Sequence, residues 1–134
     1  MTPGFTRYLI DACTRLEMGF HFEEGGCFGF AIALHRAMKA DFPESTLAMS
    51  KDGFTHAGVL QGEQFFDHHG ASPAKERYTS VSTENTLVAF ALDAGRTEDE
   101  LDADIEMARD VIGLACEIFL RCVAAGHLHD NCVP

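Results

Sequence analysis

Three side chains far apart in the chain, Cys27, His56 and Asp67, could together perform covalent thiol chemistry. Cys27 follows two glycines and opens the amphipathic run CFGFAIALH, so the sequence predicts that it begins a helix. At a helix N-terminus, unpaired backbone N–H groups and the positive end of the helix dipole favour the thiolate, which is the nucleophilic form. Gly26 would let a substrate approach the backbone closely, and the N–H of Cys27 could help to bind an oxyanion.

His56 and Asp67 are expected on neighbouring strands of one hairpin. The runs from Phe54 to Leu60 and from Gln64 to Asp67 have the composition of strands, and the turn signal Gln61-Gly62-Glu63 lies between them. The start of one strand and the end of its antiparallel neighbour lie nearly opposite each other, within reach of a side-chain hydrogen bond. A carboxylate in that position fixes the tautomer and orientation of an imidazole, as a general base requires.

Helices and a further strand must hold these residues in place. Apolar residues at a spacing of three and four predict helices over residues 5–18 and from Cys27 to about Ala40. Thr46 to Met49 has the composition of a strand, and a polar connection is expected after the hairpin. A short helix from about Glu84 to Leu92 should stop at Gly95.

A long helix is expected in the last third of the chain. Thr97-Glu98-Asp99-Glu100 has the form of a capping box, after which apolar residues form one narrow seam as far as Gly126. The seam comprises Leu101, Ile105, Ala108, Ile112, Ala115, Phe119 and Cys122. It is expected to pack on the domain, with a homodimer interface through residues 101–122 as the alternative. The acidic stretch from Glu98 to Asp104 predicts a solvated helix start, and a ligand bound there would be cationic.

Composition and charge exclude several classes of partner. The chain has 134 residues, 46% of them hydrophobic, which predicts a single compact domain over residues 1–134. A net charge of −11 would repel nucleic acid and anionic membranes. The N-terminal region lacks the uninterrupted apolar core of a secretion signal, and no segment predicts a membrane span. Five cysteines without a CxxC pair favour reduced thiols and a cytoplasmic location.

Two stretches, GGCFGFAIALHRAM and THAGVLQGEQFFDHHG, resemble the core of the papain-like and transglutaminase-like cysteine superfamily. They are also similar to the arylamine N-acetyltransferases, in which the same three residue types follow in this order. The resemblance implies an α+β fold with a papain-like core, with Cys27 as nucleophile, His56 as acid and base, and Asp67 as the orienting group. His21 stands where papain-type enzymes carry a glutamine that serves as second oxyanion donor, and Gly58 replaces an aromatic residue usual in transglutaminases.

The sequence therefore predicts a cysteine-dependent hydrolase or acyltransferase, of the thiol protease or amidase kind. It would use a Cys27-His56-Asp67 catalytic triad on an acyl, amide or peptide substrate, without a cofactor. One alternative is a catalytically inactive papain-like module that binds a protein partner. A second alternative is a small zinc hydrolase with ligands among His56 and the run Asp67-His68-His69. Because adjacent strand residues point to opposite faces, no metal ligands are assigned.

Overall fold

The computed structural model describes residues 21–39, 42–53 and 55–124. These residues form a five-stranded antiparallel sheet, three α-helices and one short π-helical turn. The fold class is α+β, as predicted. The helix predicted over residues 5–18 lies outside the described residues, as does the predicted end of the long helix at Gly126.

The sheet has the strand order β4-β3-β2-β1-β5, and each neighbouring pair is antiparallel. Its strands are β1 (Thr46–Ser50), β2 (Ala57–Gln61), β3 (Gln64–Asp67), β4 (Gly70–Pro73) and β5 (Tyr78–Val81). The predicted hairpin is confirmed, since Gln61 of β2 pairs with Gln64 of β3. Gly62 in the turn has a φ of 59°, a conformation that glycine adopts without strain.

Strands β4 and β5 occupy a segment for which the sequence predicted only a polar connection. β4 pairs with the outer side of β3, and β5 pairs with the outer side of β1. The prediction of a connection was wrong because neither strand carries a hydrophobic run that would signal burial. Both form at the edges of the sheet, where the hydrogen bonds of one neighbouring strand suffice to define them.

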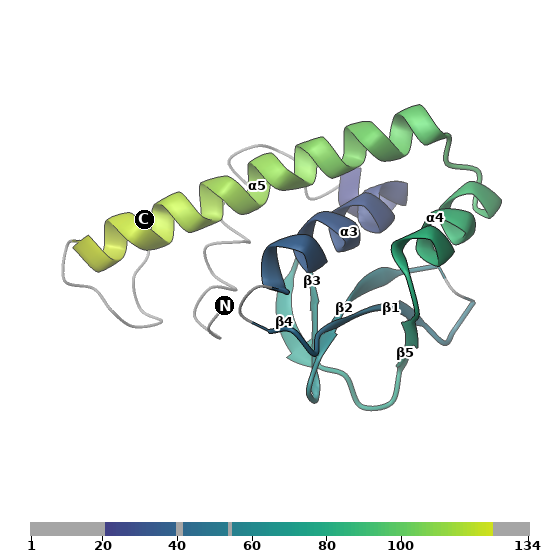
Figure 1. Ribbon diagram of the computed structural model, residues 1–134, viewed down its shortest axis with the longest axis horizontal. Coiled ribbons are helices and arrows are strands. Elements are labelled where there is room, and N and C mark those ends of the chain that lie inside the picture. Colours follow the sequence, from purple (N-terminus) through teal and green to yellow (C-terminus); the bar gives the residue numbers. More distant parts are fainter. Residues whose placement is uncertain (1–20, 40–41, 54, 125–134) are drawn as a thin grey trace.

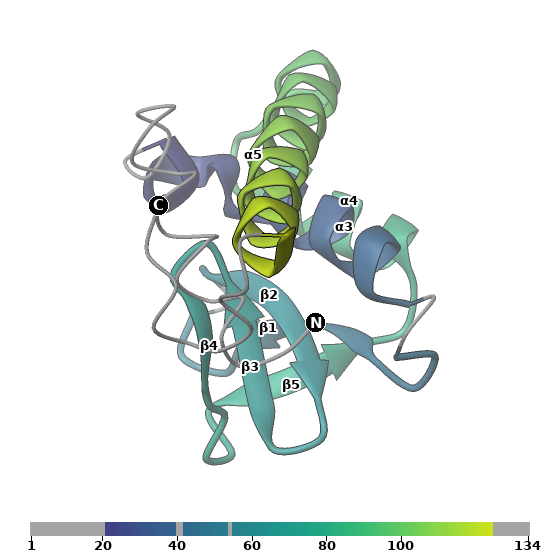
Figure 2. The same cartoon turned by 90° about the vertical axis from the view of Figure 1, so that its left-hand side faces the viewer.

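The sheet is strongly curled (Figure 2). Phe65 on β3 and Tyr78 on β5 stack face to face, with ring centroids 3.6 Å apart, although two strands lie between them in the sheet. Neighbouring strands are about 4.8 Å apart, so these rings could not meet on a flat sheet. The curl gathers the side chains of the face opposite the helices, including Phe65 and Tyr78, into a small cluster with Ala48.

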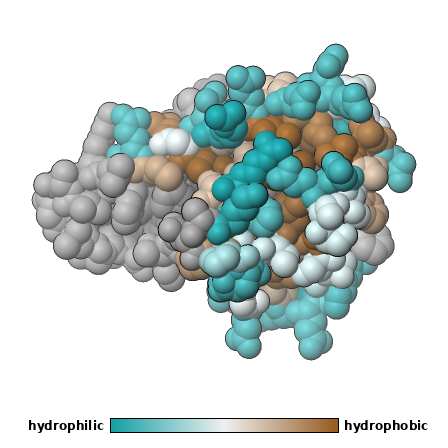
Figure 3. Space-filling view, viewed as in Figure 1, coloured by the Kyte–Doolittle hydropathy of each residue, from teal (hydrophilic) through white to brown (hydrophobic). Residues whose placement is uncertain are grey.

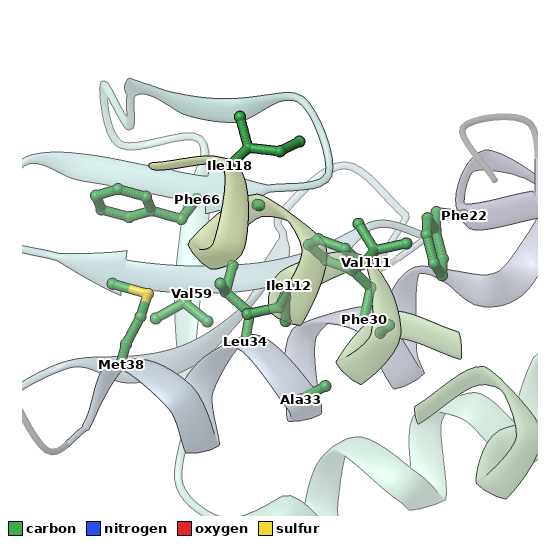
Figure 4. Packing of buried hydrophobic residues seen from close by; sticks show 12 residues of the cluster. Phe22, Phe30, Ala33, Leu34, Met38, Val59, Phe66, Val111, Ile112 and Ile118 are labelled. Atoms are coloured by element: carbon green, nitrogen blue, oxygen red, sulfur yellow. The ribbon is translucent and has the colours of Figure 1, made fainter. Parts of the chain in front are cut away.

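Helix α3 (Cys27–Met38) lies between the sheet and a long helix, α5 (Glu98–Ala124) (Figure 1). The described start and end of α3 match the predicted helix to within two residues. Its near-continuous apolar sequence is explained by burial in two clusters: Phe30, Leu34 and Met38 belong to one, and Phe28, Ala31 and Ile32 belong to the other. Figure 4 shows the side chains of the first cluster meeting Val59 and Phe66 of the sheet and residues of α5 in one core.

Helix α5 begins with the predicted capping box. The backbone N–H of Thr97 donates to Glu100 Oε1 at 3.0 Å, and the N–H of Glu100 donates to Thr97 Oγ1 at 3.1 Å. Within the described side chains, the apolar seam packs on α3 inside the same chain. Its buried members are Leu101, Ala108, Ile112 and Ala115. The side chains of Phe119 and Cys122 lie outside the described residues.

The short helix α4 (Glu84–Asp93) and the polar surface complete the fold. Thr83 caps α4 by accepting a hydrogen bond from the N–H of Thr86, and Gly95 follows with a φ of 97°.

On the face drawn in Figure 3, hydrophilic side chains surround patches of hydrophobic surface. Among the described residues, none of the helices combines the length and apolar character that crossing a bilayer requires.

Candidate active site

Cys27 is the first residue of α3, as the sequence predicted. The segment before it was not predicted: Phe22–Gly26 forms a π-helical turn, η1, in which Gly25 has a φ of 111°. A π-helical turn is closed by hydrogen bonds between residues five apart, so the chain itself uses part of the N–H groups at the head of α3. Fewer unpaired N–H groups therefore surround Cys27 than at an isolated helix start.

The Cys27 thiol lies where α3 meets the start of β2. It is 3% exposed and donates to the backbone carbonyl of Thr55, with 3.8 Å between sulfur and oxygen. Ala31 on the next turn of α3 and Ala57 in β2 belong to the same buried cluster. Because Thr55 directly precedes His56 in the chain, this contact brings the sulfur next to the imidazole.

His56 and Asp67 form the pair that the sequence predicted. His56 Nε2 and Asp67 Oδ2 are 2.7 Å apart, and Asp67 Oδ1 accepts a hydrogen bond from the N–H of His69 at 2.8 Å. The prediction that His56 lies on a strand was wrong, because β2 begins one residue later, at Ala57; with Val59 paired to Phe66, Gly58 is the residue directly opposite Asp67. His56 and Asp67 are diagonal neighbours, a separation that long side chains can bridge.

The pKa values of both His56 and Asp67 differ from their ordinary values. The pKa of His56 is raised from 6.5 to about 9, because its ring hydrogen-bonds to Asp67 and to Cys27 and these effects outweigh burial. Burial alone would raise the pKa of Asp67, but hydrogen bonds from His56 and from the His69 N–H lower it below its ordinary value. At neutral pH the geometry therefore favours an imidazolium between a carboxylate and the sulfur. Since Nε2 faces Asp67, Nδ1 is the nitrogen left to face Cys27.

Phe65 and Gly58 hold the imidazole from the sheet side. The rings of His56 and Phe65 have centroids 5.8 Å apart. A Cβ atom added to Gly58 would lie 2.3 Å from the Phe65 ring, so only glycine leaves room for that ring. The close contact with the Phe65 ring explains why residue 58 is glycine and not an aromatic residue.

His68 is buried beside the pair, and the sequence did not predict this. Its ring is 3% exposed, lies 6.2 Å from the His56 ring, and contacts Phe22 and Phe30 on the segment that carries Cys27. Within the described residues, no group of three or more His, Cys, Asp or Glu side chains is arranged to hold a metal ion. Through its ring contacts, His68 connects the segment that carries Cys27 with the His56 and Asp67 pair.

His21 and Gly26, the predicted oxyanion residues, lie against each other and against α5. His21 Nε2 is 2.7 Å from Asp104 Oδ1, and a Cβ atom on Gly26 would lie 2.8 Å from the His21 ring. Asp104 is fully buried and is also held by Arg96, with hydrogen bonds of 2.9 and 2.8 Å. The prediction that the acidic stretch up to Asp104 is solvated was therefore wrong at its last residue, because the charge of Arg96 and a hydrogen bond with His21 allow that carboxylate to be buried.

Two surface grooves lie away from the triad. One, of about 440 Å³, lies between α3 and α5 and is lined by Ala33, Arg36, Ala37, Arg109, Ile112 and Gly113. The other, of about 430 Å³, lies beside the turn between β2 and β3 and includes Leu60 and Tyr78. At the triad itself, His56 is the most open side chain, at 30% exposed, and Asp67 is 13% exposed. Solvent therefore reaches the imidazole more easily than the sulfur.

Comparison with known proteins gives no relative from which a function could be transferred. No family model, curated protein or solved structure matches the chain. The chemistry of the Cys27, His56 and Asp67 arrangement is therefore the basis for any functional conclusion.

Proposed function

We propose that the chain is a cysteine-dependent hydrolase or acyltransferase with a papain-like core and a Cys27-His56-Asp67 triad. The observation that carries this proposal is the shared imidazole: His56 is hydrogen-bonded to Asp67 on one side and interacts with Cys27 on the other. A thiol, an imidazole and an orienting carboxylate in this sequence of contacts are the parts that nucleophilic thiol catalysis needs.

In the reactive state the Cys27 proton would already reside on His56, as the raised pKa of His56 favours, so that a thiolate lies beside an imidazolium. Asp67 stabilises the imidazolium that results, and the thiolate attacks the carbonyl carbon of the substrate. The N–H of Cys27 would help to hold the negative oxygen of the tetrahedral intermediate once it is released from the hydrogen bonds of the π-helical turn η1. When the intermediate collapses, His56 returns its proton to the leaving amine, alcohol or thiol. Water, or an acceptor amine, then attacks the acyl-enzyme and releases Cys27.

The substrate would be a neutral or cationic acyl compound, such as an amide, a peptide or a thioester. The chain carries a net charge of −11, which repels anionic substrates over long range and attracts cationic ones. The same charge disfavours nucleic acid and anionic membranes as partners. Five cysteines without a CxxC pair suit a reducing compartment such as the cytoplasm, where a catalytic thiol stays reduced.

Alkylation by iodoacetamide at pH 6 tests this proposal, because an unactivated thiol reacts slowly at that pH. Cys27 should react faster than Cys116, whose thiol pKa is raised by burial. His56→Ala should slow the reaction at Cys27 by about tenfold or more, since it removes the imidazolium that would stabilise the thiolate. Lys51→Ala removes an exposed cation from the loop before β2 and should leave the rate unchanged. Equal rates at Cys27 in the native chain and His56→Ala would refute the proposal.

One observation favours a second function, that of an inactive module that binds a protein partner. Cys27 is 3% exposed and already donates to Thr55, as expected of a structural thiol. The alkylation experiment separates the two functions. A structural Cys27 would react more slowly than Cys116 at every pH, and it would be insensitive to His56→Ala.

A further inference from the structure

A buried ion cluster on α5 lies against the segment that carries Cys27. Asp104, whose side chain is 1% exposed, receives two hydrogen bonds from Arg96 and lies 2.7 Å from His21 Nε2. Arg96 extends the cluster to Glu100, at 3.1 Å. A buried carboxylate with both oxygens engaged by one guanidinium is a rigid arrangement, because losing that partner leaves the negative charge uncompensated.

Each glycine around Cys27 contacts a different member of this cluster. A Cβ atom on Gly29 would lie 2.5 Å from Asp104 Cβ, and one on Gly26 would lie 2.8 Å from the His21 ring. A Cβ atom on Gly25 would lie 3.5 Å from Arg96, and its φ of 111° also favours glycine. The glycines before and after the cysteine therefore serve close packing against α5.

The cluster and the imidazole lie on opposite sides of α3. Gly29, which faces Asp104, is two residues from Cys27, and two residues correspond to about 200° around a helix. The sulfur contacts the chain at Thr55, next to His56 on the sheet side. Any effect of the cluster on the sulfur must therefore pass through the backbone of residues 25–29.

We infer that Asp104 and Arg96 are positioning residues: they fix the backbone of residues 25–29 so that the Cys27 sulfur is held against the His56 ring. This inference rests on the proposed function for its catalytic meaning, but the geometry it describes can be measured separately. The cluster makes α5 part of the site without giving it any atom that touches a substrate. It also explains why a buried charge is present on an otherwise apolar helix seam.

Changing the two partners separately distinguishes positioning from a through-space charge effect. Asp104→Asn removes a negative charge, and Arg96→Gln removes a positive one. A through-space effect would move the His56 pKa in opposite directions in the two variants. Loss of positioning would lower the pKa in both, because the sulfur that helps to raise it moves away. Arg96→Lys keeps the charge but loses the two-point hydrogen bond, so it should also lower the pKa.

The experiment is an NMR titration of the His56 ring in the full chain, together with iodoacetamide alkylation at pH 6. All three variants should lower the His56 pKa towards the value measured for Cys27→Ala, and should slow alkylation of Cys27 by about tenfold while Cys116 is unaffected. Asp102→Asn removes an exposed carboxylate of the same helix and should change neither readout. Thermal unfolding shows which variants fold, and Arg96→Lys alone decides the question if the other two do not.

The inference is overturned if Arg96→Lys folds and leaves the His56 pKa at its native value, or if Arg96→Gln raises it. Failure of the proposed function gives a different result. In that case the pKa would still fall in the variants, but alkylation of Cys27 in the native chain would not depend on His56.

Discussion

Replacing Asp67 with asparagine removes the charge that holds the His56 imidazolium and keeps the shape of the side chain. The hydrogen bond to Asp67 is the largest cause of the raised His56 pKa, ahead of the contact with Cys27. The pKa of His56 should therefore fall from about 9 towards its ordinary value of 6.5 in Asp67→Asn. Since the ring would then be largely neutral at pH 7.5, it would no longer place a positive charge beside the Cys27 sulfur.

The same change has a calculable effect on stability. A tenfold change in proton affinity is worth about 1.4 kcal/mol, so the full displacement of the His56 pKa would correspond to about 3 kcal/mol. The side chain is 30% exposed, and solvent screening reduces this figure to about 1–2 kcal/mol. Because the folded-state pKa is raised, this stabilisation is fully present below pH 6.5 and is lost as the pH rises through about 9.

Ring NMR titration and urea unfolding at pH 6 and pH 9.5 measure the two effects. The native chain should lose about 1–2 kcal/mol of unfolding free energy between these pH values through His56, and Asp67→Asn should lose much less. Asp52→Asn, which changes an exposed aspartate in the loop before β2, is the matched control and should behave like the native chain. A His56 pKa that stays near 9 in Asp67→Asn would refute the reasoning.

Three further substitutions test the packing around the site. Gly58→Ala should lower the unfolding free energy in urea by about 1–3 kcal/mol, since the added Cβ would displace the Phe65 ring; an unchanged midpoint would contradict the close contact. Gly113→Ala, in the interior of α5 with open space around the added Cβ, should raise it by about 0.5–1 kcal/mol; destabilisation would be contrary evidence. Thr97→Ala should cost about 0.5–2 kcal/mol through loss of the cap that Thr97 and Glu100 form, and no loss would argue against that cap.

Features with a local sequence signal could be predicted without the structure. The capping box at Thr97 and Glu100, the hairpin between Gln61 and Gln64, and the helix start at Cys27 each depend on a few adjacent residues. The pairing of His56 with Asp67 followed from the hairpin, because the turn limits the possible registers. The pairing of β2 with β3 places Gly58 directly opposite Asp67, so His56 and Asp67 are diagonal neighbours.

Features that depend on tertiary partners could not be predicted. β4 and β5 have no hydrophobic period of their own and form by pairing with the edges of the sheet. Asp104 is acidic and follows an acidic stretch, so nothing in its local sequence indicates burial; only the approach of Arg96 and His21 makes burial possible. The glycines before Cys27 indicate a close approach of neighbouring chain or substrate but do not name the neighbour, which in the structure is Arg96 for Gly25 and His21 for Gly26.

Capture of an acyl-enzyme tests the central claim most directly. The native chain would be mixed with p-nitrophenyl acetate, quenched at short times and mapped by peptide mass spectrometry. The expected result is an acetyl group on Cys27 that forms and then decays, is absent in Cys27→Ala and is greatly reduced in His56→Ala. Absence of acetyl from Cys27 in the native chain, or equal acetylation of Cys27 and Cys116 that does not depend on His56, would contradict it.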